Sequence, residues 1–188
     1  MTDRAAEDDW GALSSLPGNP LMWVLILSEI VVFSAFFLAF AAARVTHLQL
    51  FRAGQAGLDP LLGGINTLVL LTSGWAAASA VRNRAEGRRA RARRRLAAAM
   101  GLGCVFIAVK LVEYAGKIAQ GFDIDSDTFH TLYFLMTGFH LMHVIFGVVV
   151  LGLVGWWDSV ENMETGAAFW HMVDLIWLVL FPLLYLMR

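Results

Sequence analysis

Cysteine and charged residues are both scarce in this chain of 188 residues. Cys104 is the only cysteine, which excludes an internal disulfide framework. Asp, Glu, Lys and Arg make up 15% of the chain, against about 25% in an ordinary soluble domain. That scarcity excludes a disordered chain and a basic nucleic-acid-binding domain. Hydrophobic residues account for 59%, above the usual 45–50% or so, and this excess predicts a membrane protein.

Five segments offer the roughly 20 mostly apolar residues that a helix needs to cross a hydrocarbon layer about 30 Å thick. Long apolar runs within them do not alternate with polar residues, as the strands of a membrane β-barrel do. The sequence therefore predicts an all-α bundle of five transmembrane helices. They are expected at Asn19–Arg44, Leu61–Val81, Leu96–Ala119, Thr128–Trp156 and Gly166–Met187.

The distribution of arginine predicts the orientation of the bundle. Eight of the fourteen basic residues lie in the connector 82–95, and loops rich in Lys and Arg stay in the cytoplasm. The amino terminus is then cytoplasmic and the carboxyl terminus periplasmic. Residues 1–18 are expected to form an acidic cytoplasmic segment, and residues 19–188 one transmembrane domain. Because no positive region precedes the first apolar segment, we expect no cleavable signal peptide.

The arginine-rich connector has a second expected role beside setting the topology. Basic side chains next to a membrane span attract anionic lipid headgroups, and a nucleic-acid partner is not expected for a loop held between two spans. The candidate headgroup contacts are Arg88, Arg89, Arg91, Arg93, Arg94 and Arg95.

Ionisable residues inside the predicted spans are candidate functional residues, because charge is costly in a bilayer. They are Glu29, Lys110, Glu113, Lys117, His140, His143, His171 and Asp174. Spacings of three or four residues let Lys110–Glu113 and Glu113–Lys117 pair within one helix. The same spacing places His140 with His143, and His171 with Asp174, on faces expected to turn toward neighbouring helices. Two interpretations of the histidines stay open: hydrogen bonding between helices, or ligands of a buried metal or haem.

Glu29 stands apart because no basic residue lies within one helical turn of it. Burial favours the protonated form of a carboxyl group, so we expect a largely neutral Glu29 unless another helix supplies a cation. It is then either a neutral acid making one interhelical hydrogen bond or a carboxyl group that exchanges protons.

Five stretches of this sequence resemble subunit III of the haem-copper oxidases (cytochrome c oxidase polypeptide III), in that family's order. The patterns Gly-Phe-His-x-x-His and Trp-His-x-x-Asp-x-x-Trp are the most specific of them. The resemblance covers residues from about 19 to 188. The stretches are Leu27–Phe33, Asn66–Gly74, Glu113-Tyr114, Thr137–Val144 and Phe169–Trp177.

The resemblance implies a non-catalytic accessory subunit or assembly factor of a haem-copper-type respiratory oxidoreductase. Classical members have seven spans, and this chain is similar to the last five; the five-span form resembles the accessory protein associated with bacterial nitric oxide reductase. Nitric oxide reductase is therefore the expected partner, with a terminal oxygen reductase as the second candidate. Glu29 matches the family's carbodiimide-reactive membrane glutamate.

The resemblance further implies no cofactor of the chain's own beyond structural phospholipids, with haem and metals in the partner subunit. The location expected is the bacterial inner membrane. Six residues are expected to lock the bundle and line a lipid or partner groove: Glu29, Glu113, His140, His143, His171 and Asp174. The alternative function is a freestanding membrane metalloprotein or small transporter that uses the same His and Glu side chains.

Overall fold

The computed structural model describes residues 20–157 and 159–187, and within these ranges the chain is helical with no strands. Five of the helices are long and apolar enough to cross a membrane, as predicted. They are α1 (Pro20–Thr46), α3 (Pro60–Ala85), α4 (Arg89–Ala119), α5 (Thr128–Trp157) and α6 (Val160–Phe181). The predicted acidic segment 1–18 lies outside the described residues.

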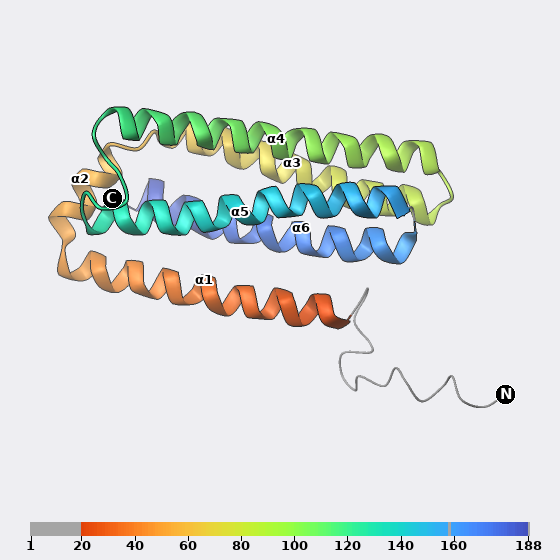
Figure 1. Ribbon diagram of the computed structural model, residues 1–188, viewed down its shortest axis with the longest axis horizontal. Helices are drawn as coiled ribbons and strands as arrows, with labels where there is room; N and C mark the ends of the chain where they lie inside the picture. The colour runs from red at the N-terminus through yellow and green to blue at the C-terminus, as the bar shows by residue number, and fades with distance from the viewer. Residues whose placement is uncertain (1–19, 158, 188) are drawn as a thin grey trace.

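Four of these helices form a bundle, and the fifth lies on its outside. Helix α3 packs on α4 and α6, and α5 packs on α4 and α6, so the four close a ring. Helix α1 lies along α5 and α6 at one edge of the bundle (Figure 1). Only 17% of its most apolar stretch is buried, against 56% for α6. Most of the α1 surface is therefore available to lipid or to another protein.

The ends of the helices differ from those predicted, because hydrophobicity locates the part that crosses the membrane and not the helix termini. Helix α4 begins at Arg89 rather than Leu96, since Arg and Ala are strong helix formers. Helix α6 begins at Val160 rather than Gly166. The Ser159 hydroxyl caps this start by accepting a hydrogen bond from the Asn162 N–H at 3.0 Å. The short helix α2 (Leu48–Ala56) was not predicted at all.

The prediction that residues 82–95 form a basic loop is wrong, because most of this segment is helical. Residues 82–85 belong to α3 and residues 89–95 to α4, which leaves a tight turn at 86–88. Gly87 has φ 76, and the Arg88 N–H donates to the Asn83 carbonyl at 2.8 Å. This is a Schellman ending, in which glycine supplies the left-handed residue. Most of the arginines are therefore held on a helix.

Trp170 of α6 packs at the centre of the bundle where two glycines make room for it. A Cβ atom on Gly103 of α4 would lie 2.8 Å from Trp170 Cη2, and one on Gly147 of α5 would lie 2.7 Å from Trp170 Cε3. The indole Nε1 donates to Ser73 Oγ at 3.1 Å, and that hydroxyl donates to the Ala99 carbonyl at 2.7 Å. One side chain thus links α3, α4, α5 and α6.

The carboxyl-terminal end of the bundle is closed by polar contacts to α2. After α6 the chain continues as a π-helix, η2 (Pro182–Leu186). Gln55 of α2 is fully buried, and its amide donates to the carbonyl oxygens of Leu183 and Leu184 at 3.0 and 3.2 Å. Backbone carbonyls that a helix end leaves without helical partners are satisfied here by a side chain. These contacts position η2 against the polar cluster described next.

Candidate functional site

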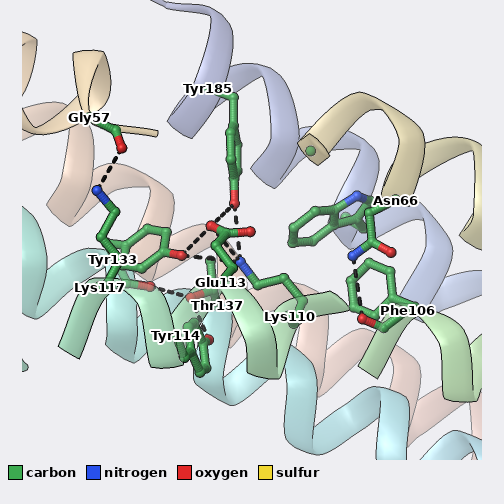
Figure 2. A network of polar contacts seen from close by, with 12 residues as sticks. Gly57, Asn66, Phe106, Lys110, Glu113, Tyr114, Lys117, Tyr133, Thr137 and Tyr185 are labelled. Atoms are coloured by element: carbon green, nitrogen blue, oxygen red, sulfur yellow. Dashed lines mark hydrogen bonds and ion pairs between the residues drawn. The ribbon is translucent and has the colours of Figure 1, made fainter. Parts of the chain in front are cut away.

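Glu113 of α4 lies at the centre of a buried polar cluster (Figure 2). Its Oε1 accepts hydrogen bonds from the hydroxyls of Tyr133 on α5 and Tyr185 on η2, the latter at 2.5 Å. The Lys110 ammonium lies 3.2 Å from the same oxygen. The predicted Lys110–Glu113 pair is therefore formed, and two tyrosines complete it.

Lys110 is 1% exposed, so its charge depends on this cluster for stabilisation. Its Nζ donates to the hydroxyls of Tyr185 at 3.1 Å and Tyr133 at 3.3 Å. The rings of Tyr114, Tyr133 and Trp177 lie 5.1, 5.1 and 5.4 Å from the ammonium. Aromatic faces at such distances attract a cation. The cluster thus holds one positive and one negative group in a nearly apolar surrounding.

All three tyrosines of the chain gather at this cluster. The third, Tyr114, forms a 2.7 Å hydrogen bond with the Thr137 hydroxyl. The contacts come from α4, α5 and η2, and removing either charge would leave the other buried without its partner. A buried ion pair of this kind is costly to break. The cluster therefore acts as an ion-pair lock: it holds α4, α5 and η2 together.

The second predicted pair on α4, Glu113 with Lys117, is wrong. Lys117 instead donates to the carbonyl oxygen of Gly57, after α2, at 2.6 Å. The hydroxyls of Tyr133 and Tyr185 and the Lys110 ammonium already surround the Glu113 Oε1 atom. Figure 2 shows the Lys117 side chain directed toward Gly57 and away from Glu113.

Glu29 of α1 faces His143 of α5, with Oε2 3.1 Å from Nε2. The other ring nitrogen of His143 lies 2.8 Å from the Phe139 carbonyl, an acceptor that requires a proton on Nδ1. With Nδ1 directed at this carbonyl, Nε2 is the ring nitrogen that faces the Glu29 carboxyl group. The basic partner that Glu29 lacks on its own helix comes from α5.

The remaining candidate residues lie in separate places. Asp174 Oδ2 is 3.5 Å from His171 Nδ1 within α6, and it fills the space beside Gly74 of α3. His140 is fully buried, and its Nε2 lies 3.2 Å from the Val173 carbonyl. The six predicted residues thus form several local contacts, centred on Glu113, on Glu29–His143 and on α6.

Two apolar grooves flank α1. The larger, of about 880 Å³, lies between α1, α3 and α6. His171 and Glu164 supply polar groups to its otherwise apolar wall. The smaller, of about 210 Å³, is lined by Glu29, His143 and the apolar side chains around them. Glu113, His140 and Asp174 do not line either groove, so only three of the six predicted residues face these surfaces.

The metal or haem interpretation finds no cluster among the residues that the structure describes. In those ranges no three His, Cys, Asp or Glu side chains converge as a metal site requires. The histidine contacts that are present go to backbone carbonyls and to single carboxylates. The geometry of these histidines is that of hydrogen-bonding and ion-pairing side chains, between helices and within them.

Asp127 and His130 form a polar contact at the start of α5 that the sequence analysis missed. The carboxylate accepts from the His130 N–H at 2.9 Å and lies 2.7 Å from the ring Nδ1. Partial burial alone would raise the pKa of Asp127, but the hydrogen bonds from His130 and its electrostatic interaction with the carboxylate lower the pKa below its usual value. Asp immediately before a helix is a favoured capping residue, accepting from the backbone N–H three positions on, and this signal was visible in the sequence.

Comparison with known proteins places these features in one family. The sequence profile described as "Cytochrome c oxidase subunit III" matches residues 19–188. "Cytochrome c oxidase subunit 3" of Thermostichus vulcanus is 30% identical over 177 residues, covering 87% of this chain and 84% of that protein. The protein of that name from Marchantia polymorpha is 33% identical over 176 residues, covering 86% and 65%. This chain therefore spans about two thirds of the plant relative.

Proposed function

This chain belongs to the cytochrome c oxidase subunit III family, and on that basis we propose that it is a non-catalytic accessory subunit of a haem-copper-type respiratory oxidoreductase. The observation that carries the proposal is the match along residues 19–188, which include every described helix. The haem and metals belong, in this proposal, to the partner subunit. The membrane is the bacterial inner membrane, with the amino terminus in the cytoplasm.

The structure supports an auxiliary role through its outer surface. Helix α1 exposes large apolar side chains along its length, among them Val24, Leu27, Val31 and Leu38. Apolar side chains of this kind pack equally well against lipid and against a neighbouring transmembrane helix. We propose that this face and the groove of about 880 Å³ hold structural phospholipids and the catalytic subunit.

Nitric oxide reductase is the first candidate for that catalytic subunit. The five membrane-crossing helices among the described residues and the resemblance of the chain to the accessory protein of that enzyme support this choice. A terminal oxygen reductase is the second candidate, and the names of the relatives support it. Purification of the tagged chain from native membranes in mild detergent decides between them. Nitric oxide reductase activity in the eluate favours the first candidate, and oxygen consumption the second.

Deletion of the chain tests the accessory role itself. We expect the catalytic subunit to assemble in lower amount or to lose activity faster during sustained turnover, while its spectrum per haem stays unchanged. Complementation with the intact gene controls for effects on neighbouring genes. Unchanged amount, activity and lifetime of the partner complex would contradict the proposal.

The alternative, a freestanding metalloprotein or small transporter, has its own readout. Such a protein would bind stoichiometric metal or haem after purification, or move a solute across vesicles without another subunit. We expect neither metal in stoichiometric amount nor a Soret band in the isolated chain.

A further inference from the structure

A third cavity, of about 520 Å³, lies on the side of the α3–α4 hairpin, near the turn that joins the two helices. Three of its five lining residues are arginines, unlike those of the apolar grooves beside α1. The lining residues are Asn83, Arg91, Arg94, Arg95 and Ala98. Figure 1 shows this turn at the end of the bundle opposite α2.

Three of the arginines meet at this cavity because of helical spacing. Arg91, Arg94 and Arg95 lie three and four residues apart, and such residues share one face of a helix. That face of α4 lies against the end of α3, which contributes Asn83. The arrangement is a pocket with basic walls rather than a row of dispersed charges.

Contacts within the protein hold two of these guanidinium groups in place. The Arg95 guanidinium lies over the Trp75 ring of α3, 4.8 Å from its centroid, and arginine favours such contacts with aromatic faces. Arg94 Nε donates to the Ala90 carbonyl at 3.4 Å. Neither contact neutralises a positive charge. Pre-oriented guanidinium groups bind an anion at lower entropic cost than flexible ones.

Among the described residues, the three arginines that line the cavity, Arg91, Arg94 and Arg95, form no ion pair with a carboxylate. Helix α4 has no acidic residue in its first turn, where the helix dipole itself is positive. The adjacent carboxylate, Glu86, pairs with Arg88 across the turn. Positive side chains at a positive helix end repel one another, and a bound anion would relieve that repulsion.

We propose that the cavity lined by Asn83, Arg91, Arg94 and Arg95 is a specific binding site for one phosphate group. Guanidinium groups match the geometry of phosphate through paired N–H donors. The phosphate belongs either to the headgroup of an anionic lipid or to a soluble phosphate compound, because the same donors recognise both. This site does not depend on the identity of the oxidoreductase partner.

The test compares two variants of the full chain with equal loss of charge. The site variant carries Arg91→Gln, Arg94→Gln and Arg95→Gln. The control variant carries Arg88→Gln, Arg89→Gln and Arg93→Gln, three positions of the same arginine run that do not line the cavity. Circular dichroism and melting temperature establish that both variants fold. Binding of phosphatidylglycerol is counted by native mass spectrometry from neutral detergent, and binding of inorganic pyrophosphate is measured by titration calorimetry.

We expect one saturable anion per chain, with affinity weakened at least about tenfold in the site variant and by no more than about twofold in the control. Saturable phosphatidylglycerol without pyrophosphate identifies a lipid headgroup, and saturable pyrophosphate identifies a soluble phosphate. Equal weakening in both variants would overturn the proposal, because net charge alone would then account for binding. Absence of saturable binding to either probe would also overturn it. Arg95→Lys keeps the charge but not the guanidinium group over the Trp75 ring, and we expect it to weaken binding.

Discussion

Replacement of Glu113 tests whether the buried cluster is an ion-pair lock. Glu113→Gln keeps the size of the side chain but removes the charge that faces Lys110 at 3.2 Å. Lys110 is 1% exposed and is left without its counter-charge. Breaking a buried pair in this way costs about 3–5 kcal/mol, which lowers the melting temperature of a chain this size by roughly 6–20 °C.

A double variant separates the ion pair from simple packing. Lys110→Met with Glu113→Gln removes both charges, while Tyr133 and Tyr185 still have an amide to contact. We expect the double variant to be more stable than Glu113→Gln alone, because no unpaired charge is buried. Glu161→Gln is the matched control, since Glu161 is exposed in the first turn of α6 and its loss is expected to cost less than about 1 kcal/mol.

Melting temperatures in one detergent, with tryptophan fluorescence as the probe, measure all of these variants. A melting temperature of Glu113→Gln within about 2 °C of the unaltered chain would refute the ion-pair lock. Lys110→Met alone is measured as well. A double variant destabilised by the sum of Lys110→Met and Glu113→Gln would equally contradict the lock, because the two charges would then act independently.

Three further predictions concern other parts of the molecule. Gly147→Ala places a methyl group 2.7 Å from Trp170 Cε3 and is expected to destabilise the bundle by about 1–3 kcal/mol; Gly101→Ala, where no atom lies within 4 Å of the new Cβ, should be neutral in the same melting assay. The pKa of Asp127 is lowered in the folded chain, so its stabilising contribution is present above the unfolded pKa of about 3.9 and is lost as pH falls through the folded pKa. Asp127→Ala should therefore lower the melting temperature at pH 6 and make progressively less difference below about pH 4, and a difference independent of pH would count against the assignment. Glu29→Gln keeps the size of the side chain that faces His143 but removes its ability to ionise, so we expect ordinary stability with altered sustained turnover of the partner complex; unchanged turnover would reduce Glu29 to a packing role.

The parts of the fold that depend on local pattern could be predicted from the sequence. The number of spans followed from apolar length, and the Lys110–Glu113 pair followed from a spacing of three residues on one helix. The ends of the helices were harder to predict from the sequence. Helix α4 begins at Arg89 because Arg and Ala extend the helix beyond the hydrocarbon layer, and hydropathy does not indicate where a helix ends outside that layer. The arginine-rich segment was mistaken for a loop for the same reason.

The partners of the polar residues could not be predicted, because they come from other helices. Tyr133 and Tyr185 lie 20 and 72 residues from Glu113 in the chain, and His143 lies on a different helix from Glu29. Which faces of the helices meet depends on packing, including the room that Gly103 and Gly147 leave for Trp170. The meeting of all three tyrosines at the cluster follows from this packing and not from their positions in the sequence.

The accessory role is tested most directly by purifying the tagged chain from native membranes and then separating it from any associated protein. We expect a complex with haem absorbance and reductase activity, from which the isolated chain emerges folded, without haem and without activity. An isolated chain that itself carries out electron transfer, with its own bound metal or haem, would contradict the accessory role.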